Sequence, residues 1–547
     1  MKSLLETEPR LAAELPLKNR LIFQVEEEKA YSTPFVQRFF ARPSIFFSLV
    51  LLLTALQIKW LLEIVSFDEG GPFSYLWLLA FSFLSLNISV LATQALFGLF
   101  VKAPYFPEVD RSQVDSIPIA LLYCVKNEPF GLKERIEYTL KGNLLPNLDL
   151  WILSDSNDSF GNEEEKLVGE LKNEFGWERV FYRRRVKPQE RKQGNIKDWL
   201  IRCGSSYQYL IVCDADSLLP RGWAREVLRI AEHPKHSKVG IFQSAIYVAH
   251  EASLFSRMQA TAQFYAQRLY FHVNQAVLGR SIAFGHNCLI RREAFQKIEL
   301  PEGILSHDNW ETALLEQKGY KTVYLSNLIS FEEAAPHYLE ERKRSKRWLK
   351  GTLQGWPLLF LPNISFSTRF LIFYQIYLYL VQPVLCFWIV STLFAGPQFF
   401  TSGNISFQLF VFTLGVLFFH KMVVVKNLMD VRRILQETFF STLIGLQNIL
   451  YGTFNFIAIP FERLGWTPMA KRPGERLSFS ECAKSLFIGT FAGVGLFWFG
   501  LNQSSTWTLF TLPVLLSLIL SIPFVYFSSK NLFMKGRYAP VRLKETA

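Results

Sequence analysis

Long apolar segments constrain this chain more than any other feature. Half of its 547 residues are hydrophobic and 51 are phenylalanine, which is too apolar for an ordinary soluble protein. A helix needs about 20 consecutive apolar residues to cross a bilayer. Segments of about this length lie at 45–67, 73–100, 370–395, 405–425, 486–501 and 507–527. We therefore expect a polytopic membrane protein with helices on both sides of one long polar region.

The basic residues predict how these segments are oriented. Lys and Arg concentrate in loops on the cytoplasmic side of a membrane. The connector 68–72 carries none, whereas residues 1–44 carry seven, and basic residues also follow the last segment, at Lys530, Lys535 and Arg537. The lipid bilayer is thus an expected partner, with both termini and the polar region facing the cytoplasm.

One apolar segment, 438–461, does not fit this alternation. It lies between two basic segments and contains Gly445, Gly452 and Pro460. One full crossing would invert the final pair of spans, so we expect a hairpin, a re-entrant segment or an interfacial helix. The resulting domain boundaries are a cytoplasmic segment 1–44, a first helix pair 45–100, a cytoplasmic α/β domain 104–350, an interfacial segment 351–369, a second membrane region 370–529 with a basic loop 463–484, and a tail 530–547.

Composition excludes several other classes of protein. The formal net charge is +12, but no basic-aromatic module typical of nucleic-acid recognition is present, so we expect no nucleic-acid partner. The six cysteines have no paired spacing, which argues against a disulfide framework and against a zinc site. We expect the thiols to be reduced.

The polar region alternates between two kinds of segment. Short apolar runs of strand length are separated by helix-length polar segments such as 132–141 and 163–175. The expected strands are 117–125, 148–154, 179–182, 207–213 and 239–243. This alternation predicts a mostly parallel sheet with helices on both faces. Ligands of such sheets bind at the carboxyl ends of the strands.

Carboxylates follow three of the expected strands. Glu128 and Asp155 come after the first two, and Asp214 and Asp216 end the run LIVCDADSLLP (210–220). Paired carboxylates suit Mg²⁺ or Mn²⁺, which would neutralise a nucleoside diphosphate leaving group. A strand end of this kind is where a nucleotide-sugar enzyme holds its metal, so we expect Asp214 and Asp216 to bind it. We expect Glu128 and Asp155 to accept hydrogen bonds from the uracil and ribose of the nucleotide-sugar donor. The alternative is an acidic strand end with no ligand.

A second diphosphate-binding element is expected where a helix begins at 191–195. Its sequence is Arg-Lys-Gln-Gly-Asn, and a glycine-containing helix start beside cations suits an anion. Lys192 and Asn195 are the candidate donor ligands. Ordinary capping residues and solvated charges are the alternative.

Transfer of a sugar from such a donor to an acceptor hydroxyl also needs a general base and a surface that holds the acceptor sugar. Asp308 is the candidate general base that removes a proton from the attacking hydroxyl, although an aspartate here could also cap a helix. Arg344, Arg347 and Trp348 are spaced to share one helical face. The two guanidinium groups would hold the diphosphate and the indole would carry the acceptor sugar. We interpret the neighbouring lysines as the basic face of an interfacial helix next to lipid, and not as ligands of the substrate. They are Lys343, Lys346 and Lys350.

Five stretches together make a more specific pattern. They are ERKQGNIKDWL (190–200), YLIVCDADS (209–217), GHNCLIRREAF (285–295), GILSHDNWETALL (303–315) and KRSKRWLKGTLQ (343–354). In these motifs the chain resembles the glucans biosynthesis glucosyltransferase H family, within the processive family 2 membrane glycosyltransferases. The likeness is dense over about 117–356, and Gly-His-Asn and Leu-Ser-His-Asp distinguish it from cellulose and hyaluronan synthases.

The resemblance implies a GT-A-like fold and a processive, inverting transfer of glucose from UDP-glucose to a growing β-1,2-linked glucan. The product would be delivered to the periplasm of a Gram-negative bacterium from its inner membrane. It further implies an acyl carrier protein and a periplasmic glucan-processing protein as partners. About 44 residues precede the first span, fewer than in family members, so no regulatory role of a longer extension is carried over.

The family's site residues transfer to this chain position by position. The implied roles are Asp155 as the first carboxylate, Asp214 and Asp216 as the metal pair, Asp308 as the base, Gly285, His286 and Asn287 as the acceptor-side segment, and Arg347 and Trp348 as the Arg-Trp motif. Arg344 is a departure, because many relatives have Gln there.

Three alternatives remain open. Another family 2 polysaccharide synthase, such as a cellulose-like enzyme, would share the order of carboxylates. A polyprenyl-phosphate glycosyltransferase would need neither the Arg-Trp motif nor so many later spans. A transporter would place ionisable residues inside its spans, and only Lys59, Glu63, His420 and Lys421 approach this, near span ends.

Overall fold

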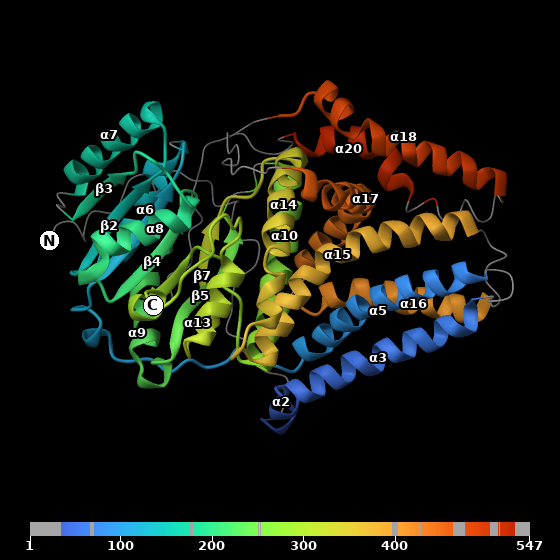
Figure 1. Cartoon of the computed structure of the whole chain (residues 1–547), viewed down its shortest axis with the longest axis horizontal. Helices are drawn as coiled ribbons and strands as arrows, with labels where there is room; N and C mark the ends of the chain where they lie inside the picture. The colour runs from blue at the N-terminus through green and yellow to red at the C-terminus, as the bar shows by residue number, and fades with distance from the viewer. Residues whose placement is uncertain are drawn as a thin grey trace.

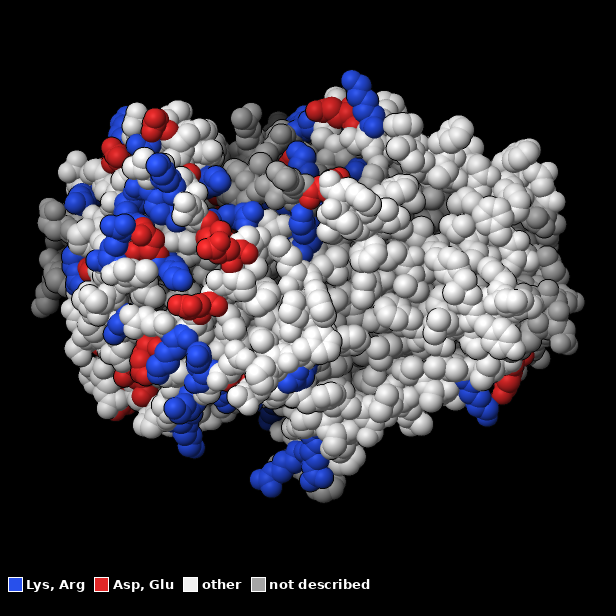
Figure 2. Space-filling view, in the orientation of Figure 1, with Lys and Arg blue, Asp and Glu red and all other residues white. Residues whose placement is uncertain are grey.

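The computed structural model places a sheet-containing domain at one end and a block of long helices at the other (Figure 1). It describes residues 34–65, 71–128, 130–175, 179–249, 251, 253–395, 403–425, 428–462, 476–503, 512 and 515–530. Lys, Arg, Asp and Glu side chains crowd the surface of the sheet domain, whereas the visible surface of the helical block carries very few (Figure 2).

The domain is built on one seven-stranded sheet. Its strands are β1 (Ile119–Val125), β2 (Leu148–Ser154), β3 (Val180–Arg184), β4 (Tyr209–Asp214), β5 (Val239–Val248), β6 (Cys288–Arg291) and β7 (Lys321–Glu332). Their order in the sheet is β3-β2-β1-β4-β6-β5-β7. Only β6 among them runs antiparallel to its neighbours, so the expected mostly parallel sheet is confirmed.

Strand register explains why the acidic residues meet. In β1, Cys124 pairs with Asp214 of β4, and Val125 pairs with Ser154 of β2. The three strands therefore end at the same edge, and the residues that follow them share one rim. The first five strands lie where the apolar runs predict them, whereas β6 and β7 were not predicted.

Helices cover both faces of the sheet, as expected. Helices α6 (Leu132–Asn143), α7 (Asp158–Phe175) and α9 (Trp223–Glu232) pack on one face, and α8 (Arg191–Arg202), α12 (Arg292–Phe295) and α13 (Asp308–Gln317) pack on the other. Alternate residues of β1 belong to the two cores, with Leu121 and Tyr123 in the first and Ala120 and Leu122 in the second.

Further helices connect the sheet to the membrane block. Between β5 and β6 lie α10 (Leu254–Tyr265), the π-helix η5 (Ala266–Phe271) and α11 (His272–Leu278), and after β7 come α14 (Tyr338–Leu353) and the 3₁₀ segment η6 (Trp356–Phe360). Other short 3₁₀ segments are η2 (Arg111–Gln113), η3 (Gly204–Ser206), η4 (Pro234–His236) and η8 (Ile459–Phe461).

The membrane block contains α2 (Pro34–Phe40), α3 (Pro43–Ile64), α5 (Pro72–Gly98), α15 (Phe366–Ala395), α16 (Gly403–Met422), α17 (Leu428–Ala458), α18 (Phe479–Gln503) and α20 (Ser521–Ser528). Within the described part of the chain, five helices are long and apolar enough to cross a membrane. They correspond to α3, α5, α15, α17 and α18. The expected membrane protein is thus confirmed, while its topology stays a prediction.

The structure corrects the expectation for segment 438–461. A hairpin or re-entrant form is wrong, because α17 runs without a break from Leu428 to Ala458. The glycines do not interrupt it. A Cβ atom at Gly452 would lie 1.5 Å from the side-chain oxygen of Gln382 in α15, so this glycine admits a neighbouring helix. The unbroken helix agrees with the expected interfacial form, and it is also long and apolar enough for one crossing.

Some expectations lie outside the described residues. These include most of the amino-terminal segment (1–33), much of the basic loop (463–475), the start of the last expected span (504–511) and the tail (531–547).

Candidate active site

A cavity of about 620 Å³ lies at the carboxyl edge of the sheet, between the sheet and the membrane helices. Its lining includes the following residues that sequence analysis selected: Glu128, Asp155, Lys192, Asn195, Asp214, Asp216, Gly285, His286, Asp308, Arg344, Arg347 and Trp348. They come from seven segments of the chain. Only Asn287 among the selected residues is absent from the lining.

Asp155, which follows β2, is held by two partners. Arg185 donates to both carboxylate oxygens, over 2.8 and 2.7 Å, and the Asn195 amide donates to one of them over 3.0 Å. Arg185 also donates to the carbonyl oxygens of Gln189 and Arg191, both at 2.9 Å. Asp155 therefore ties the start of α8 to the sheet edge, and its predicted contact with a nucleoside would add to these bonds.

Asp214, at the end of β4, lies among cations. The Lys192 ammonium forms an ion pair with one of its oxygens and also donates to the Gly285 carbonyl at 2.7 Å. His286 Nδ1 lies 3.8 Å from the other oxygen. Burial opposes ionisation of Asp214, but Lys192 and His286 outweigh it and lower the pKa of this carboxyl.

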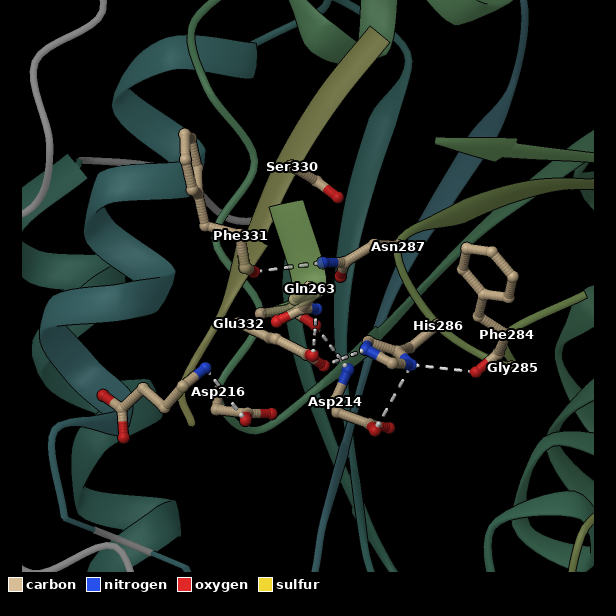
Figure 3. A network of polar contacts seen from close by, with 12 residues as sticks. Asp214, Asp216, Gln263, Phe284, Gly285, His286, Asn287, Ser330, Phe331 and Glu332 are labelled. Carbon is tan, nitrogen blue, oxygen red and sulfur yellow. Dashed lines mark hydrogen bonds and ion pairs between the residues drawn. The ribbon is translucent and has the colours of Figure 1, made fainter. Parts of the chain in front are cut away.

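His286 links Asp214 to β7. Its Nε2 lies 2.9 Å from a carboxylate oxygen of Glu332, and its Nδ1 lies 3.0 Å from the Phe284 carbonyl. Both ring nitrogens thus face acceptors, as Figure 3 shows, and this arrangement favours the doubly protonated ring. Burial opposes the charge, but Asp214 and Glu332 raise the pKa of His286 to about 9.

Gly285 is needed because Asp308 approaches so closely. The residue has φ +77°, and a Cβ atom there would lie 2.3 Å from Asp308 Oδ1. It lines the cavity through its backbone. A glycine at this position thus opens the space that the carboxylate of Asp308 occupies.

The structure places Asn287 away from the cavity. Its side chain is fully buried and donates to the Phe331 carbonyl at 3.1 Å, and its own carbonyl accepts from the Ser244 hydroxyl at 2.6 Å. A direct contact with the acceptor, as predicted, does not fit this burial. Asn287 instead fastens the start of β6 to its neighbours.

Asp308 begins α13. Its carboxylate accepts a hydrogen bond from the Ser306 hydroxyl at 3.1 Å. The residue that caps the helix is His307, which makes no side-chain capping bond. His307 Nδ1 lies 3.2 Å from oxygens of both Asp308 and Glu311. Burial disfavours the cation, but Glu311 and Asp308 raise the pKa of His307.

Helix α14 presents the predicted basic and aromatic side chains to the cavity. The Arg344 guanidinium lies 4.5 Å from the centre of the Trp348 ring and 2.7 Å from Glu341. Trp348 is 48% exposed, which leaves indole surface available to a ligand. The spacing of Arg344, Arg347 and Trp348 thus brings them together on one helix, as expected.

The lysines of α14 face another way. Lys346 pairs with Glu462, and Lys350 donates to the Glu462 carbonyl at 2.8 Å. Both contacts tie α14 to the chain that follows α17.

The cavity continues toward the membrane helices. Gln375, Leu378, Tyr379 and Gln382 of α15 line its far wall. Tyr379 and Gln382 also line a second cavity of about 300 Å³, together with Asn448, Gly452 and Asn455 of α17 and Arg342 of α14, among others. The two cavities therefore meet at α15.

Several residues of the site were not predicted from the sequence. Arg185, Glu332 and Gln263 are examples, and Gln263 donates to Glu332 at 2.7 Å. Glu332 carried a usable signal, since it ends a strand as Asp214 does. Gln263 lies next to the π-helix η5, and such an irregularity cannot be read from the sequence.

Comparison with known proteins identifies the domain. Residues 209–421 match the model of the glycosyl transferase family group 2. The glucans biosynthesis glucosyltransferase H of Pseudomonas aeruginosa (strain UCBPP-PA14) is 30% identical over 454 residues, covering 73% of this chain and 52% of the relative. The protein of the same name from Pseudomonas fluorescens (strain Pf0-1) is 28% identical over 464 residues, covering 74% and 53%. This chain thus spans about half the length of these relatives.

Among solved structures, a mannosyltransferase from Pyrobaculum calidifontis in complex with GDP-Man and Mn²⁺ is similar with a TM-score of 0.47 and 13% identity, covering 66% of this chain and 97% of the other. The family match and the sheet confirm the expected GT-A-like α/β domain, and the curated relatives confirm the predicted resemblance. The chain is therefore a membrane protein with a glycosyltransferase domain of family group 2, and it is homologous to the glucans biosynthesis glucosyltransferases H.

Proposed function

We propose that this protein is a processive, inverting glucosyltransferase that takes glucose from UDP-glucose and builds a β-1,2-linked glucan. The single observation that carries the proposal is the cavity itself. Strand-end carboxylates, the carboxylate of Asp308 and the Arg-Trp face of α14 line one space beside a membrane helix. The names of the curated relatives support glucose as the sugar and glucan as the product.

A divalent metal, Mg²⁺ or Mn²⁺, fits the residues present. Asp214 and Asp216 offer hard oxygen ligands at one strand end, and phosphate oxygens of a donor would complete the coordination. When bound, the metal would neutralise charge on the departing diphosphate. Lys192, Arg344 and Arg347 line the same cavity and would bind the remaining diphosphate oxygens.

In the transfer step, Asp308 would take the proton from the acceptor hydroxyl as that oxygen attacks the anomeric carbon. Inversion requires the attack to come from the side opposite the diphosphate. Trp348 would hold the terminal sugar of the acceptor against its exposed ring. Glu128 and Asp155 would position the uridine.

We further propose that the protein lies in a bacterial inner membrane with the α/β domain in the cytoplasm, and that the glucan leaves through the membrane helices. The second cavity supports such a path, because it continues from the first at Tyr379 and Gln382 and is lined by amides of Asn448 and Asn455. Polar lining at membrane depth suits a water-filled route.

Donor selectivity tests the proposed chemistry. Purified protein with Mn²⁺ should release UDP from UDP-glucose much faster than from UDP-galactose or UDP-N-acetylglucosamine, and the Asp308→Asn variant should release little from any of them. Equal rates with the three donors, or none with UDP-glucose, would contradict the proposal. For export, sealed vesicles with the cytoplasmic face outward should accumulate glucan protected from added glucanase. Product that stays fully digestible would contradict the export path.

A further inference from the structure

Strand β7 ends at Glu332, a second glutamate, Glu333, follows it directly, and the two side chains bind different partners. Successive side chains of a strand point to opposite sides. Glu332 approaches His286, at 2.9 Å, whereas Glu333 pairs with Arg135 of α6, at 2.8 Å. Each of these partners in turn contacts the segment Asp214–Asp216. None of Arg135, Glu332 and Glu333 was selected from the sequence.

The contacts of Glu333 hold the second half of this segment. Its backbone N–H donates to Asp216 Oδ2 at 3.3 Å. Its carboxylate accepts from two nitrogens of Arg135, at 3.1 and 2.8 Å, and a third nitrogen of the same guanidinium donates to the Ala215 carbonyl at 3.1 Å. The side chains of Arg135 and Glu333 are only 6% and 10% exposed, so water screens these bonds little.

Gly131 makes room for this arrangement. It has φ +66°, and a Cβ atom there would lie 2.9 Å from an Arg135 nitrogen. Arg135 also donates to the Phe130 carbonyl at 2.9 Å. The guanidinium is therefore fixed from three sides, and its planar fork suits such a position better than an ammonium would.

The contacts of Glu332 hold the first half. His286 lies between Glu332 and Asp214, with Nε2 toward Glu332 and Nδ1 3.8 Å from Asp214, and Figure 3 shows the three side chains converging. Gln263 donates to the other oxygen of Glu332 at 2.7 Å. Both oxygens of Glu332 are therefore engaged, and the imidazole that faces Asp214 is oriented.

Strand pairing alone would not bring these elements together. Strands β6 and β5 separate β4 from β7 in the sheet. After Asp216 the chain crosses that gap, and Leu218 pairs with Phe331 through two backbone hydrogen bonds of 2.9 Å. The end of β7 is therefore the surface on which the segment after β4 rests.

We propose that Glu332 and Glu333 are positioning residues, which act through His286 and Arg135 to set the two carboxylates of Asp214 and Asp216 for metal binding. This inference rests on the metal site of the proposed function. Replacing a residue that hydrogen-bonds to a metal ligand and orients it typically lowers metal affinity by about 10-fold to 100-fold. The effect should therefore appear in metal affinity before it appears in turnover at saturating metal.

The experiment is a titration of the purified 547-residue protein with Mn²⁺, in which electron paramagnetic resonance measures free Mn²⁺. Arg135→Lys keeps the charge but removes the planar fork. Arg135→Met combined with Glu333→Met removes the pair without changing net charge, so a shift cannot be a simple loss of negative potential. Asp115→Asn combined with Arg225→Met is the control, because Asp115 precedes β1 at the opposite edge of the sheet and its partner, Arg225 of α9, lies 3.1 Å away.

We expect Arg135→Lys and the double variant to bind Mn²⁺ at least about 10-fold more weakly, with the control within about twofold of the unmodified protein. Excess Mn²⁺ should restore turnover in both variants, which a merely damaged fold would not allow. Mn²⁺ affinity within twofold of the unmodified protein, in a variant whose melting temperature is unchanged, would overturn the inference. If the double variant does not fold, Arg135→Lys and Glu332→Gln decide by the same criterion. No Mn²⁺ binding to the unmodified protein would instead refute the metal site of the proposed function, and this inference with it.

Discussion

Replacing Gly285 with alanine should nearly abolish glucosyl transfer while leaving UDP binding intact. The added methyl group would lie 2.3 Å from Asp308 Oδ1 and 2.8 Å from a ring carbon of His307, far inside van der Waals contact. Either the carboxylate or the backbone must move. Asp308 is the proposed base, so its displacement affects the transfer step rather than the affinity for the donor.

The magnitude has two parts. Gly285 has a left-handed backbone conformation, φ +77°, and a residue with a Cβ atom costs about 1–2 kcal/mol there. That cost lowers stability. The displacement of the base is the larger effect on catalysis, since a misplacement of about 1 Å can cost about 100-fold in rate.

Gly319 offers a matched control. It has φ +80°, and a Cβ atom there would meet nothing within 4 Å. Gly319→Ala should therefore carry the backbone cost without the clash. The assay compares initial rates of labelled glucose transfer from UDP-glucose with Mn²⁺ present, and UDP affinity by calorimetry, for both variants and the unmodified protein.

We expect Gly285→Ala to lose about 100-fold in rate and Gly319→Ala to keep a rate within a few-fold of normal. Normal turnover in Gly285→Ala would refute the assignment of the site around Asp308. An equal loss in both variants would show that backbone strain, and not the clash, causes the effect.

Four further outcomes are expected. Asp308→Asn should lower glucosyl transfer by about 100-fold or more with UDP binding retained, and near-normal rates would exclude the base role. Asp216→Ala should abolish the metal dependence together with activity, whereas full activity with a chelator present would exclude a metal ligand here. Trp348→Ala should reduce elongation more than it reduces hydrolysis of UDP-glucose, and equal losses would indicate a packing role. Glu311 and Asp308 raise the pKa of His307. The protonated imidazole therefore stabilises the fold fully below the pKa that histidine has in the unfolded chain, and this stabilisation is lost as pH rises through the raised pKa of the folded state. The melting temperature should fall over that pH interval more in the unmodified protein than in His307→Gln, and parallel curves would contradict this.

The sequence predicted those parts of the fold that depend on local pattern. The apolar runs of β1 and β2 and the carboxylates that follow them are local features, and register then brings them to one edge. The first two membrane helices begin one or two residues before the predicted spans. Each starts at a proline, Pro43 or Pro72, because proline is favoured at the first position of a helix.

Features that depend on distant contacts were not predictable. The antiparallel strand β6 has only four residues, too few for a periodicity to be read. Gly452 was interpreted as an interruption, but it provides space for Gln382, which is distant in the sequence. The contact between Asn287 and Phe331 has the same character, and it moves a motif residue from the cavity into the core.

Arg135 and Arg185 show why the site was only partly predicted. Arg185 donates to the predicted carboxylate of Asp155, and Arg135 donates to the backbone carbonyl of Ala215, between Asp214 and Asp216. Each arginine lies in a different part of the chain from the group that it binds. A basic residue in an amphipathic helix or after an edge strand has no distinguishing local pattern. Its role appears only when the partner carboxylates are in place.

Linkage analysis of the product tests the central claim most directly. Purified protein, supplied with labelled UDP-glucose and Mn²⁺ and no other sugar donor, should make a polymer that yields 1,2-linked glucose after methylation and hydrolysis. The Asp308→Asn variant should make none. A labelled polymer with another linkage would contradict the proposed glucan, and the absence of any polymer alongside normal UDP binding would contradict the processive transfer itself.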